Sequence, residues 1–217
     1  RLRGHLNYWA RTHKLETIKV EEFKEFGRHK FTTFFNALSG AKPGYLIGSG
    51  EGEDENLAIF NSIIHIGANP PLLGFIQRPT TVDRHTYQNI LKYKHYSFNL
   101  ITEDFFEEAH QTSARYTKGI NEFKEVGLTA IYKEKTRCPF VAESPLHITL
   151  ELHDDMEIKS NKTRLIIGKV LSVSQPESLA ENKYRLNFQV LKGMNISGLT
   201  DYYTLTKDKS LNYAKPK

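Results

Sequence analysis

Short strand-like runs recur along most of this chain, and no regular alternation with helices separates them. A doubly wound parallel sheet would alternate its strands with helical patterns of about 10–15 residues. Apolar or alternating patterns occupy residues 45–49, 56–66, 72–77, 96–101, 147–152, 164–173 and 184–191. This distribution predicts a mainly β fold, in the form of a barrel that carries a few helices.

The start of the chain has a different, helical pattern. Apolar side chains spaced along residues 17–27 and 31–38 predict two amphipathic helices. We expect residues 1–40 to form a helical lead-in that packs on a barrel of residues 41–217.

Two further helices are expected inside the barrel region. The first covers residues 83–93, with Asp83 as its N-cap, and the second covers residues 103–116. The sequence contains no linker that would divide the 217 residues, so we expect one domain overall.

Composition excludes several classes of protein. Hydrophobic residues make up 39% of the chain and charged residues 25%, which argues against intrinsic disorder. No run approaches the roughly 18 apolar residues of a membrane helix, and no signal-like pattern follows Arg1. Cys138 is the single cysteine, so an intrachain disulfide is impossible, and a reducing, cytoplasmic setting is the simplest interpretation.

The charge balance is mildly basic. A formal net charge of +5 suits anionic ligands. Nucleic-acid binding would require clustered Lys and Arg among exposed aromatic residues. The lysines are instead spread out, with a modest concentration in residues 207–217. A nucleic-acid-binding barrel is therefore a third hypothesis that rests on net charge alone, and we expect no nucleic-acid partner.

The motifs of several common site types are absent. Residues 48–52 are glycine-rich but lack the lysine and spacing of a P-loop, and the acidic run 50–55 is typical of a hairpin turn. The nine histidines are scattered, so no metal site is expected, and no G-x-S-x-G elbow occurs. Cys138 is expected to be a buried structural thiol.

One ordered segment does combine features of a ligand site. In the predicted strand Asn56-Leu57-Ala58-Ile59-Phe60-Asn61-Ser62, small Ala58 leaves room for a flat ring, and Asn61 and Ser62 can donate to a phosphate. Arg78 follows the next strand, and its guanidinium suits phosphate oxygens. Thr86 and Asn89 then lie one helical turn apart.

The order of these motifs resembles that of the flavin reductase-like family, whose members have an FMN-binding split β-barrel. The resemblance runs from about Phe31 to the C-terminus. The motifs that carry it are Asn56-Leu57-Ala58-Ile59-Phe60-Asn61-Ser62, Asn69-Pro70-Pro71-Leu72, Arg78-Pro79, Thr86-Tyr87-Gln88-Asn89-Ile90, Phe98-Asn99, Glu143-Ser144-Pro145 and Ile167-Gly168-Lys169-Val170.

The resemblance implies an FMN-binding split β-barrel with an N-terminal helical extension, in a homodimer whose flavin sites lie near the subunit interface. It also implies NADH or NADPH as a co-substrate. By the same carry-over, the phosphate would be held by Asn61, Ser62 and Arg78 and closed off by Thr86 and Asn89. The ring or the ribityl chain would be lined by Gly48, Ser49, Asn56 and Ala58.

The sequence also departs from the family pattern. Many family reductases have a histidine at the position of Thr163, on the nicotinamide side, and Asn61 replaces a commoner serine. The resemblance leaves open whether His110 and Ser113 approach the flavin. Two hypotheses follow, namely an FMN-dependent oxidoreductase, or a flavin-binding carrier or electron-transfer module without nicotinamide turnover, which Thr163 slightly favours.

Overall fold

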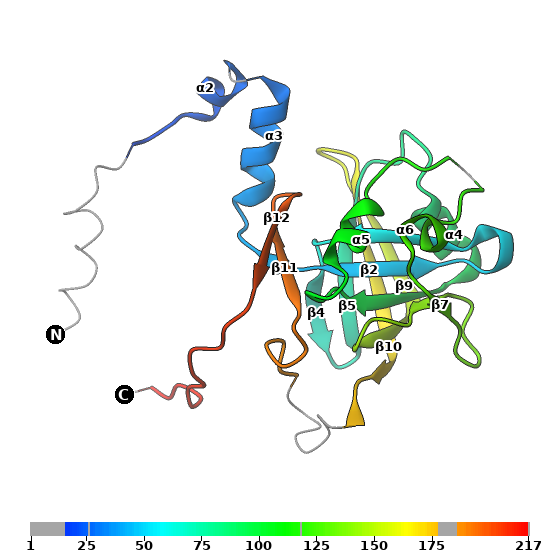
Figure 1. The fold of residues 1–217 in the computed structure, drawn as a ribbon. Coiled ribbons are helices and arrows are strands. Elements are labelled where there is room, and N and C mark those ends of the chain that lie inside the picture. Colours follow the sequence, from blue (N-terminus) through cyan, green and yellow to red (C-terminus); the bar gives the residue numbers. More distant parts are fainter. Residues whose placement is uncertain (1–15, 26, 118, 178–185, 217) are drawn as a thin grey trace.

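One long antiparallel sheet dominates the computed structural model, which describes residues 16–25, 27–117, 119–177 and 186–216 (Figure 1). Its seven strands are ordered β3-β2-β6-β9-β10-β5-β4. Their bounds are β2 Tyr45–Ser49, β3 Asn56–Phe60, β4 Ile64–Ala68, β5 Pro71–Gln77, β6 His95–Leu100, β9 His147–Ile158 and β10 Thr163–Ser174. The predicted mainly β fold with a few helices is confirmed.

The sheet curves until its two ends meet, which makes it a barrel. The ring of Phe60, at the end of β3, lies against the ring of Phe75 on β5, with centroids 4.9 Å apart. The Ser62 hydroxyl then donates to the Ile76 carbonyl (3.2 Å) and accepts from the Ile76 amide (3.1 Å). These contacts join the first strand of the sheet to its sixth.

Strand β2 is buried on both faces because the barrel has two hydrophobic cores. Tyr45 and Ile47 point into the barrel interior, where they join Phe75 and Phe98. Leu46 points outward into a second core. Alternate side chains of a strand face opposite sides, so every residue of β2 is buried.

The second core is covered by short helices and small sheets. These elements are α5 Phe106–Gln111, α6 Glu122–Val126, β1 Lys42–Pro43, β11 Met194–Ser197, β12 Asp201–Thr204, β7 Ala130–Ile131 and β8 Phe140–Val141. Helix α4 His85–Tyr93 packs against β2, β3 and β6, and the short helix η1 Gly52–Asp54 forms the turn between β2 and β3. Helix α4 therefore adjoins the segments predicted to form the site.

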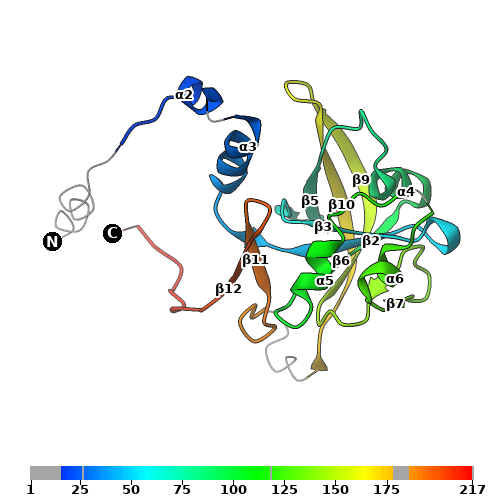
Figure 2. The same cartoon turned by 45° about the horizontal axis from the view of Figure 1, so that its top comes forward.

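The lead-in contains helices α2 Val20–Glu25 and α3 Arg28–Ala37, and neither has a buried residue. Both stand away from the barrel in Figures 1 and 2, with α3 beside the β11–β12 hairpin. Their phenylalanines contact one another instead, since the rings of Phe23 and Phe34 are 4.4 Å apart. The division at residue 40 stays a prediction.

Four expectations about elements are corrected. Residues 56–66 do not form one strand, because the chain turns the barrel corner between β3 and β4. Within residues 103–116, only the α5 segment Phe106–Gln111 is an α-helix. Residues 186–191 form no strand, since 188–191 form a turn, and 184–185 lie outside the described residues.

The fourth correction concerns the start of α4. Its N-cap position is Arg84, which makes no side-chain capping bond. Asp83 instead accepts a hydrogen bond from the Gln88 side chain (3.1 Å). In the described part of the chain, no helix has the length and apolarity needed to cross a membrane.

Candidate functional site

A cluster of buried polar side chains lies where β2, β3, α4 and α6 meet, and we call Ser49, Asn56, Thr86, Asn89 and Glu122 the buried polar cluster. Each is at most 7% exposed. With its amide oriented to satisfy both ends, Asn56 accepts from the Thr86 hydroxyl (2.9 Å) and donates to Glu122 (3.3 Å). Glu122 also accepts from the Leu57 amide (3.3 Å). Burial raises the pKa of the Glu122 carboxyl.

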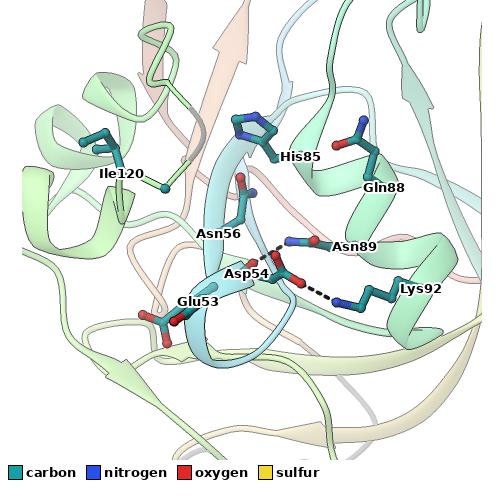
Figure 3. Close-up of a pocket in the computed structure, with 10 residues that line it drawn as sticks. Glu53, Asp54, Asn56, His85, Gln88, Asn89, Lys92 and Ile120 are labelled. Atoms are coloured by element: carbon teal, nitrogen blue, oxygen red, sulfur yellow. Dashed lines mark hydrogen bonds and ion pairs between the residues drawn. The ribbon is translucent and has the colours of Figure 1, made fainter.

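Asn89 links this cluster to the acidic turn. Its side-chain amide donates to the Asp54 carbonyl (2.6 Å) and to the Ser49 carbonyl (3.4 Å). Asn89 and Asn56 line a cavity of about 330 Å³ together with charged residues of the turn and of α4 (Figure 3). Hydrogen bonds from the Asn89 side chain therefore hold the turn against α4.

The acidic side chains of this turn are mostly paired. Glu51 pairs with Arg137 (2.6 Å), and Asp54 pairs with Lys92 (2.6 Å). Glu55 accepts from the Asn121 amide (2.6 Å) and from the Tyr132 hydroxyl. The expected hairpin-turn role of residues 50–55 fits this arrangement. Among the described residues, no group of three or more His, Cys, Asp or Glu side chains could hold a metal ion.

Gly48 leaves no space for a ligand atom on its Cα hydrogen side. A Cβ built there would lie 2.2 Å from the Pro139 carbonyl oxygen and 2.7 Å from the Ser97 hydroxyl. Neighbouring Ser49 is fully buried. Both residues belong to the packed interior of the barrel wall.

The other predicted residues of β3 lie at its far end. Asn61 donates to the Gly198 carbonyl (2.8 Å), which fastens the β11–β12 turn, while Ser62 bonds to the Ile76 backbone. Ala58 is half-buried in β3. Asn56 and Asn61 are five residues apart, or roughly 16 Å along a strand. The structure thus separates Thr86 and Asn89 from the Asn61 end, where they were predicted to close the phosphate site.

Arg78 follows β5 and is exposed, and it belongs to a set of guanidiniums that we call the arginine group: Arg78, Arg84 and Arg115. The Arg84 side chain donates to the Pro79 carbonyl (3.2 Å), so it folds back beside Arg78. Partial burial lowers the pKa of Arg84, and repulsion from Arg78 and Arg115 adds to this effect. Within the described residues, none of these three guanidiniums pairs with a carboxylate.

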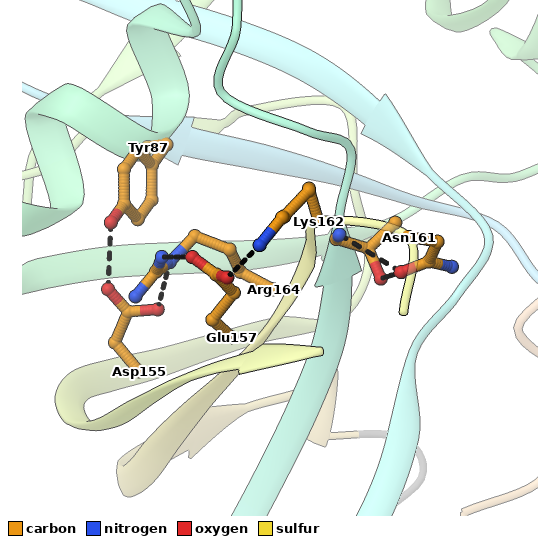
Figure 4. A network of polar contacts seen from close by, with 7 residues as sticks. Tyr87, Asp155, Glu157, Asn161, Lys162 and Arg164 are labelled. Atoms are coloured by element: carbon orange, nitrogen blue, oxygen red, sulfur yellow. Dashed lines mark hydrogen bonds and ion pairs between the residues drawn. The ribbon is translucent and has the colours of Figure 1, made fainter. Parts of the chain in front are cut away.

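A neighbouring arginine, by contrast, is paired with carboxylates. Arg164 is the register partner of Gln77, which precedes Arg78. Its guanidinium pairs with Asp155 (2.6 Å) and Glu157 (3.4 Å), and Tyr87 donates to the same Asp155 (2.8 Å; Figure 4). Arg164 is thus neutralised internally, whereas the arginine group is not.

Sequence reasoning assigned no functional role to Arg84, Arg115 or Glu122. Arg84 lies in the same connection between β5 and α4 as Arg78, and this shared loop was the available signal. Arg115 and Glu122 follow α5 in a different part of the chain, so their positions depend on tertiary packing.

The remaining candidates serve other contacts. His110 Nδ1 lies 2.9 Å from the Tyr202 hydroxyl and links α5 to β12, while Ser113 is exposed just after α5. The Thr163 hydroxyl donates to the Asn161 side chain (2.7 Å) at the start of β10. Cys138 is buried as expected, and burial raises the pKa of its thiol to about 12. That thiol is protonated at neutral pH.

Comparisons with known proteins converge on one fold. The family described as "Flavin reductase like domain" matches residues 39–192. A structure from Shewanella frigidimarina, described as a flavin reductase with a split barrel domain, is 37% identical. The match covers 93% of this chain and 100% of that chain, with a TM-score of 0.87.

Two further solved structures share this fold at lower identity. An FMN-binding protein from Thermus thermophilus is 16% identical over 81% of this chain and 93% of its own, with a TM-score of 0.69. An NADH:FAD oxidoreductase from Streptomyces globisporus is 15% identical over 90% of this chain and 100% of its own, with a TM-score of 0.67. The expected split β-barrel is confirmed by the Shewanella match.

Proposed function

Because this chain belongs to the flavin reductase-like family, we propose that it is an FMN-binding oxidoreductase that oxidises a reduced nicotinamide nucleotide. The electrons would pass to free flavin or to another acceptor. Among the similar structures, the FMN-binding protein and the NADH:FAD oxidoreductase support the flavin and the nicotinamide parts of this proposal, respectively.

The observation that carries the proposal is the exposed Arg78, which has no carboxylate partner among the described residues, beside the corner where β3 meets β5. A phosphate monoester carries about −1.5 to −2 charges near neutral pH, and guanidinium groups bind such groups in a forked geometry. Arg84, held beside Arg78 by the Pro79 carbonyl, supplies a second cation. These residues fit the phosphate of FMN.

The other predicted residues divide into two roles under this proposal. Half-buried Ala58 would lie beneath the ring, and the corner residues Asn61 and Ser62 would shape the site through the backbone contacts that they fix. Gly48, Ser49, Asn56, Thr86 and Asn89 would not touch the flavin; they would hold β2, β3 and α4 in place.

When bound, FMN supplies the redox chemistry itself, since its ring accepts hydride from a reduced nicotinamide and releases electrons onward. The protein side chains bind the phosphate and position the ring. Because the reaction needs no side chain as a general acid or base, the protonated, buried Cys138 and the bonded His110 need no catalytic role.

We also propose a homodimer. The supporting feature is exposed apolar surface in two places, on the lead-in and on the end of β10. Leu38 is 61% exposed, and Val173 is 51% exposed. Such residues commonly lie in interfaces when they gather in patches. Light scattering on the purified protein tests this point, and a monomeric mass would contradict it.

The decisive experiment is direct. The protein is purified, its absorbance spectrum is recorded, and it is reconstituted with FMN and supplied with NADH or NADPH. We expect flavin absorbance bands and nicotinamide oxidation with a flavin acceptor. Failure to retain FMN would remove the proposed function. Salt-sensitive binding of DNA or RNA by the colourless protein would select the nucleic-acid hypothesis instead.

A second candidate is a flavin carrier without turnover, and Thr163 favours it. The family resemblance implies a histidine at this position, whereas here the Thr163 hydroxyl is bonded to the Asn161 side chain. Firm FMN retention without oxidation of either nucleotide would select the carrier.

A further inference from the structure

The cavity between the acidic turn and α4 has the size of a binding site for a small molecule. One wall is a single face of α4, formed by side chains at helical spacing: His85, Gln88, Asn89 and Lys92. The other walls are residues 53–56 of the turn and Gly119 and Ile120, which precede α6. None of the lining residues belongs to the loop 78–84. The volume of about 330 Å³ is far larger than the roughly 30 Å³ of one water molecule.

A buried acceptor without a donor opens into this cavity. The Asn89 side chain is 7% exposed, and Figure 3 shows it reaching from α4 toward the turn. Its nitrogen donates to the Asp54 and Ser49 carbonyls, so the direction of the amide is fixed. Its oxygen, Oδ1, accepts no hydrogen bond from the described residues, and it is not among the fully enclosed polar atoms. Oδ1 can therefore accept from a bound molecule.

The lining of the cavity also carries an excess of negative charge. Asp54 pairs with Lys92 (2.6 Å). The Glu55 carboxylate accepts hydrogen bonds from two neutral side chains, so its charge is not cancelled. Glu53 is exposed and forms no ion pair with the described residues. Two carboxylates thus lack a cation, which disfavours a phosphate and favours a positively charged ligand.

We propose that this cavity binds a small organic cation, namely a primary ammonium group on a short aliphatic chain. An ammonium has three N–H donors, so the Asn89 oxygen and a carboxylate can bind it together. Ile120, which is 40% exposed, supplies an apolar contact for the carbon chain. A metal ion does not suit the cavity, because the described residues contain no group of three or more His, Cys, Asp or Glu that could hold one.

The test compares three probes of nearly equal size and different charge, which are n-butylammonium, n-butanol and butyrate. Each is titrated into the isotope-labelled full chain, and the backbone NMR signals are followed. We expect n-butylammonium to bind with a dissociation constant on the order of 1 mM and to shift the signals of residues 53–56 and 119–120. n-Butanol should bind about tenfold more weakly, because it lacks the charge-assisted contact, and butyrate should not bind.

A matched pair of variants separates the cavity from the general surface charge. Glu53→Lys places a positive charge at the cavity and should weaken n-butylammonium binding about tenfold. Glu21→Lys makes the same change of charge at an exposed position of α2, away from α4 in Figures 1 and 2. This control should keep the wild-type affinity within about twofold.

Several outcomes would overturn the proposal. These are no binding of n-butylammonium, equal affinity for n-butylammonium and butyrate, and wild-type affinity in Glu53→Lys. An equal loss in both variants would also overturn it, because the surface charge as a whole would then govern binding. The titration is repeated with FMN at saturation, and we expect the same affinity. Displacement of n-butylammonium by FMN would assign the cavity to the flavin instead. Retention of FMN tests the proposed function separately.

Discussion

The buried polar cluster and the arginine group both adjoin the first turns of α4, yet they differ in whether their side chains have bonding partners within the chain. In the cluster, the Asn56 side chain accepts from Thr86 and donates to Glu122. The Asn89 side chain donates to two carbonyls. In the arginine group, Arg78 and Arg115 repel the guanidinium of Arg84, and none of the three has a carboxylate partner in the described part of the chain. Apart from the Ser49 hydroxyl, which is buried without a hydrogen-bond partner, the side chains of the cluster are bonded within the chain, whereas the proposed function gives the arginine group an anion as its partner.

This contrast separates stability from binding. A buried polar group that keeps its partners contributes modestly to stability, but the loss of one partner is costly. Surface charges held together without counter-ions cost stability, and they are typical of sites where a ligand supplies the counter-charge. Changes in the cluster should therefore alter the free energy of unfolding, and changes in the arginine group should alter ligand affinity.

The largest expected effect is that of Gly48→Ala. The added methyl group would meet the Pro139 carbonyl oxygen at 2.2 Å, and that atom belongs to the backbone. We expect the free energy of unfolding to fall by about 3 kcal/mol, as in severe overpacking. Urea unfolding measures this change. If Gly48 instead contacted the flavin, the variant would keep its stability and lose FMN affinity.

Arg78→Ala should produce the next largest effect, and it should appear in ligand affinity. Loss of one charge-assisted contact to the phosphate should weaken FMN binding by one to two powers of ten, about 1.5–3 kcal/mol. The free energy of unfolding without FMN should stay the same or rise slightly, since repulsion with Arg84 is relieved. Flavin fluorescence titration measures the affinity.

The matched control for Arg78→Ala is Arg164→Gln, at a paired arginine of the adjacent strand. Arg164 is bonded to Asp155 (2.6 Å), so its loss should lower stability and leave FMN affinity nearly unchanged. Unchanged FMN affinity in Arg78→Ala would remove Arg78 from the site. The two regions would then no longer differ in the way proposed.

Asn89→Ala should have a smaller effect, confined to stability. The substitution removes the donor to the Asp54 and Ser49 carbonyls. Asp54 lines the cavity, so water can replace the lost donor to its carbonyl. We expect a loss of about 1–2 kcal/mol in the free energy of unfolding. FMN affinity per folded molecule should not change. A loss of FMN affinity with normal stability would place Asn89 at the ligand, as the family resemblance implies.

Much of the fold could be predicted because its signals are local. Alternation of apolar residues indicated β6 and the first half of β9, and apolar spacing indicated α3. Strands β11 and β12 were missed because each has four residues and depends on partners elsewhere in the chain. Met194 pairs with Thr204, and Ile196 pairs with Lys42, so neither strand has an independent sequence pattern.

The candidate site was predictable to the same limited extent. Arg78 could be found because it directly follows a strand and precedes a proline. Glu122 could not, because its carboxylate meets the Leu57 amide across 65 residues of sequence. Strand alternation placed Asn56 and Asn61 on opposite faces, but their separation into different regions depends on the barrel corner that follows β3, which was not predicted.

The smallest expected effect concerns pH and the buried cluster alone. Burial raises the pKa of Glu122 in the folded protein above its value in the unfolded chain. The folded state therefore binds more protons between these two pKa values, so stability should decline as pH rises through that window. Glu122→Gln removes this titration and should flatten the decline. In this variant the Asn56 side chain can rotate so that its Nδ2 donates to the Thr86 hydroxyl (2.9 Å). Its Oδ1 then accepts from the new side-chain amide at position 122.

Urea unfolding of the wild-type protein and of Glu122→Gln, repeated from about pH 4 to pH 8, measures the difference in slope. Parallel slopes would mean that Glu122 titrates as it does in water, and hence that solvent reaches the cluster through the cavity beside Asn56. The affinity for FMN should change only with the second ionisation of its phosphate, near pH 6, and equally in both proteins, because the arginine group keeps its charge throughout this range. If affinity and stability changed together with Glu122, the two regions would be coupled through α4, and the separation of binding from stability would fail at this residue.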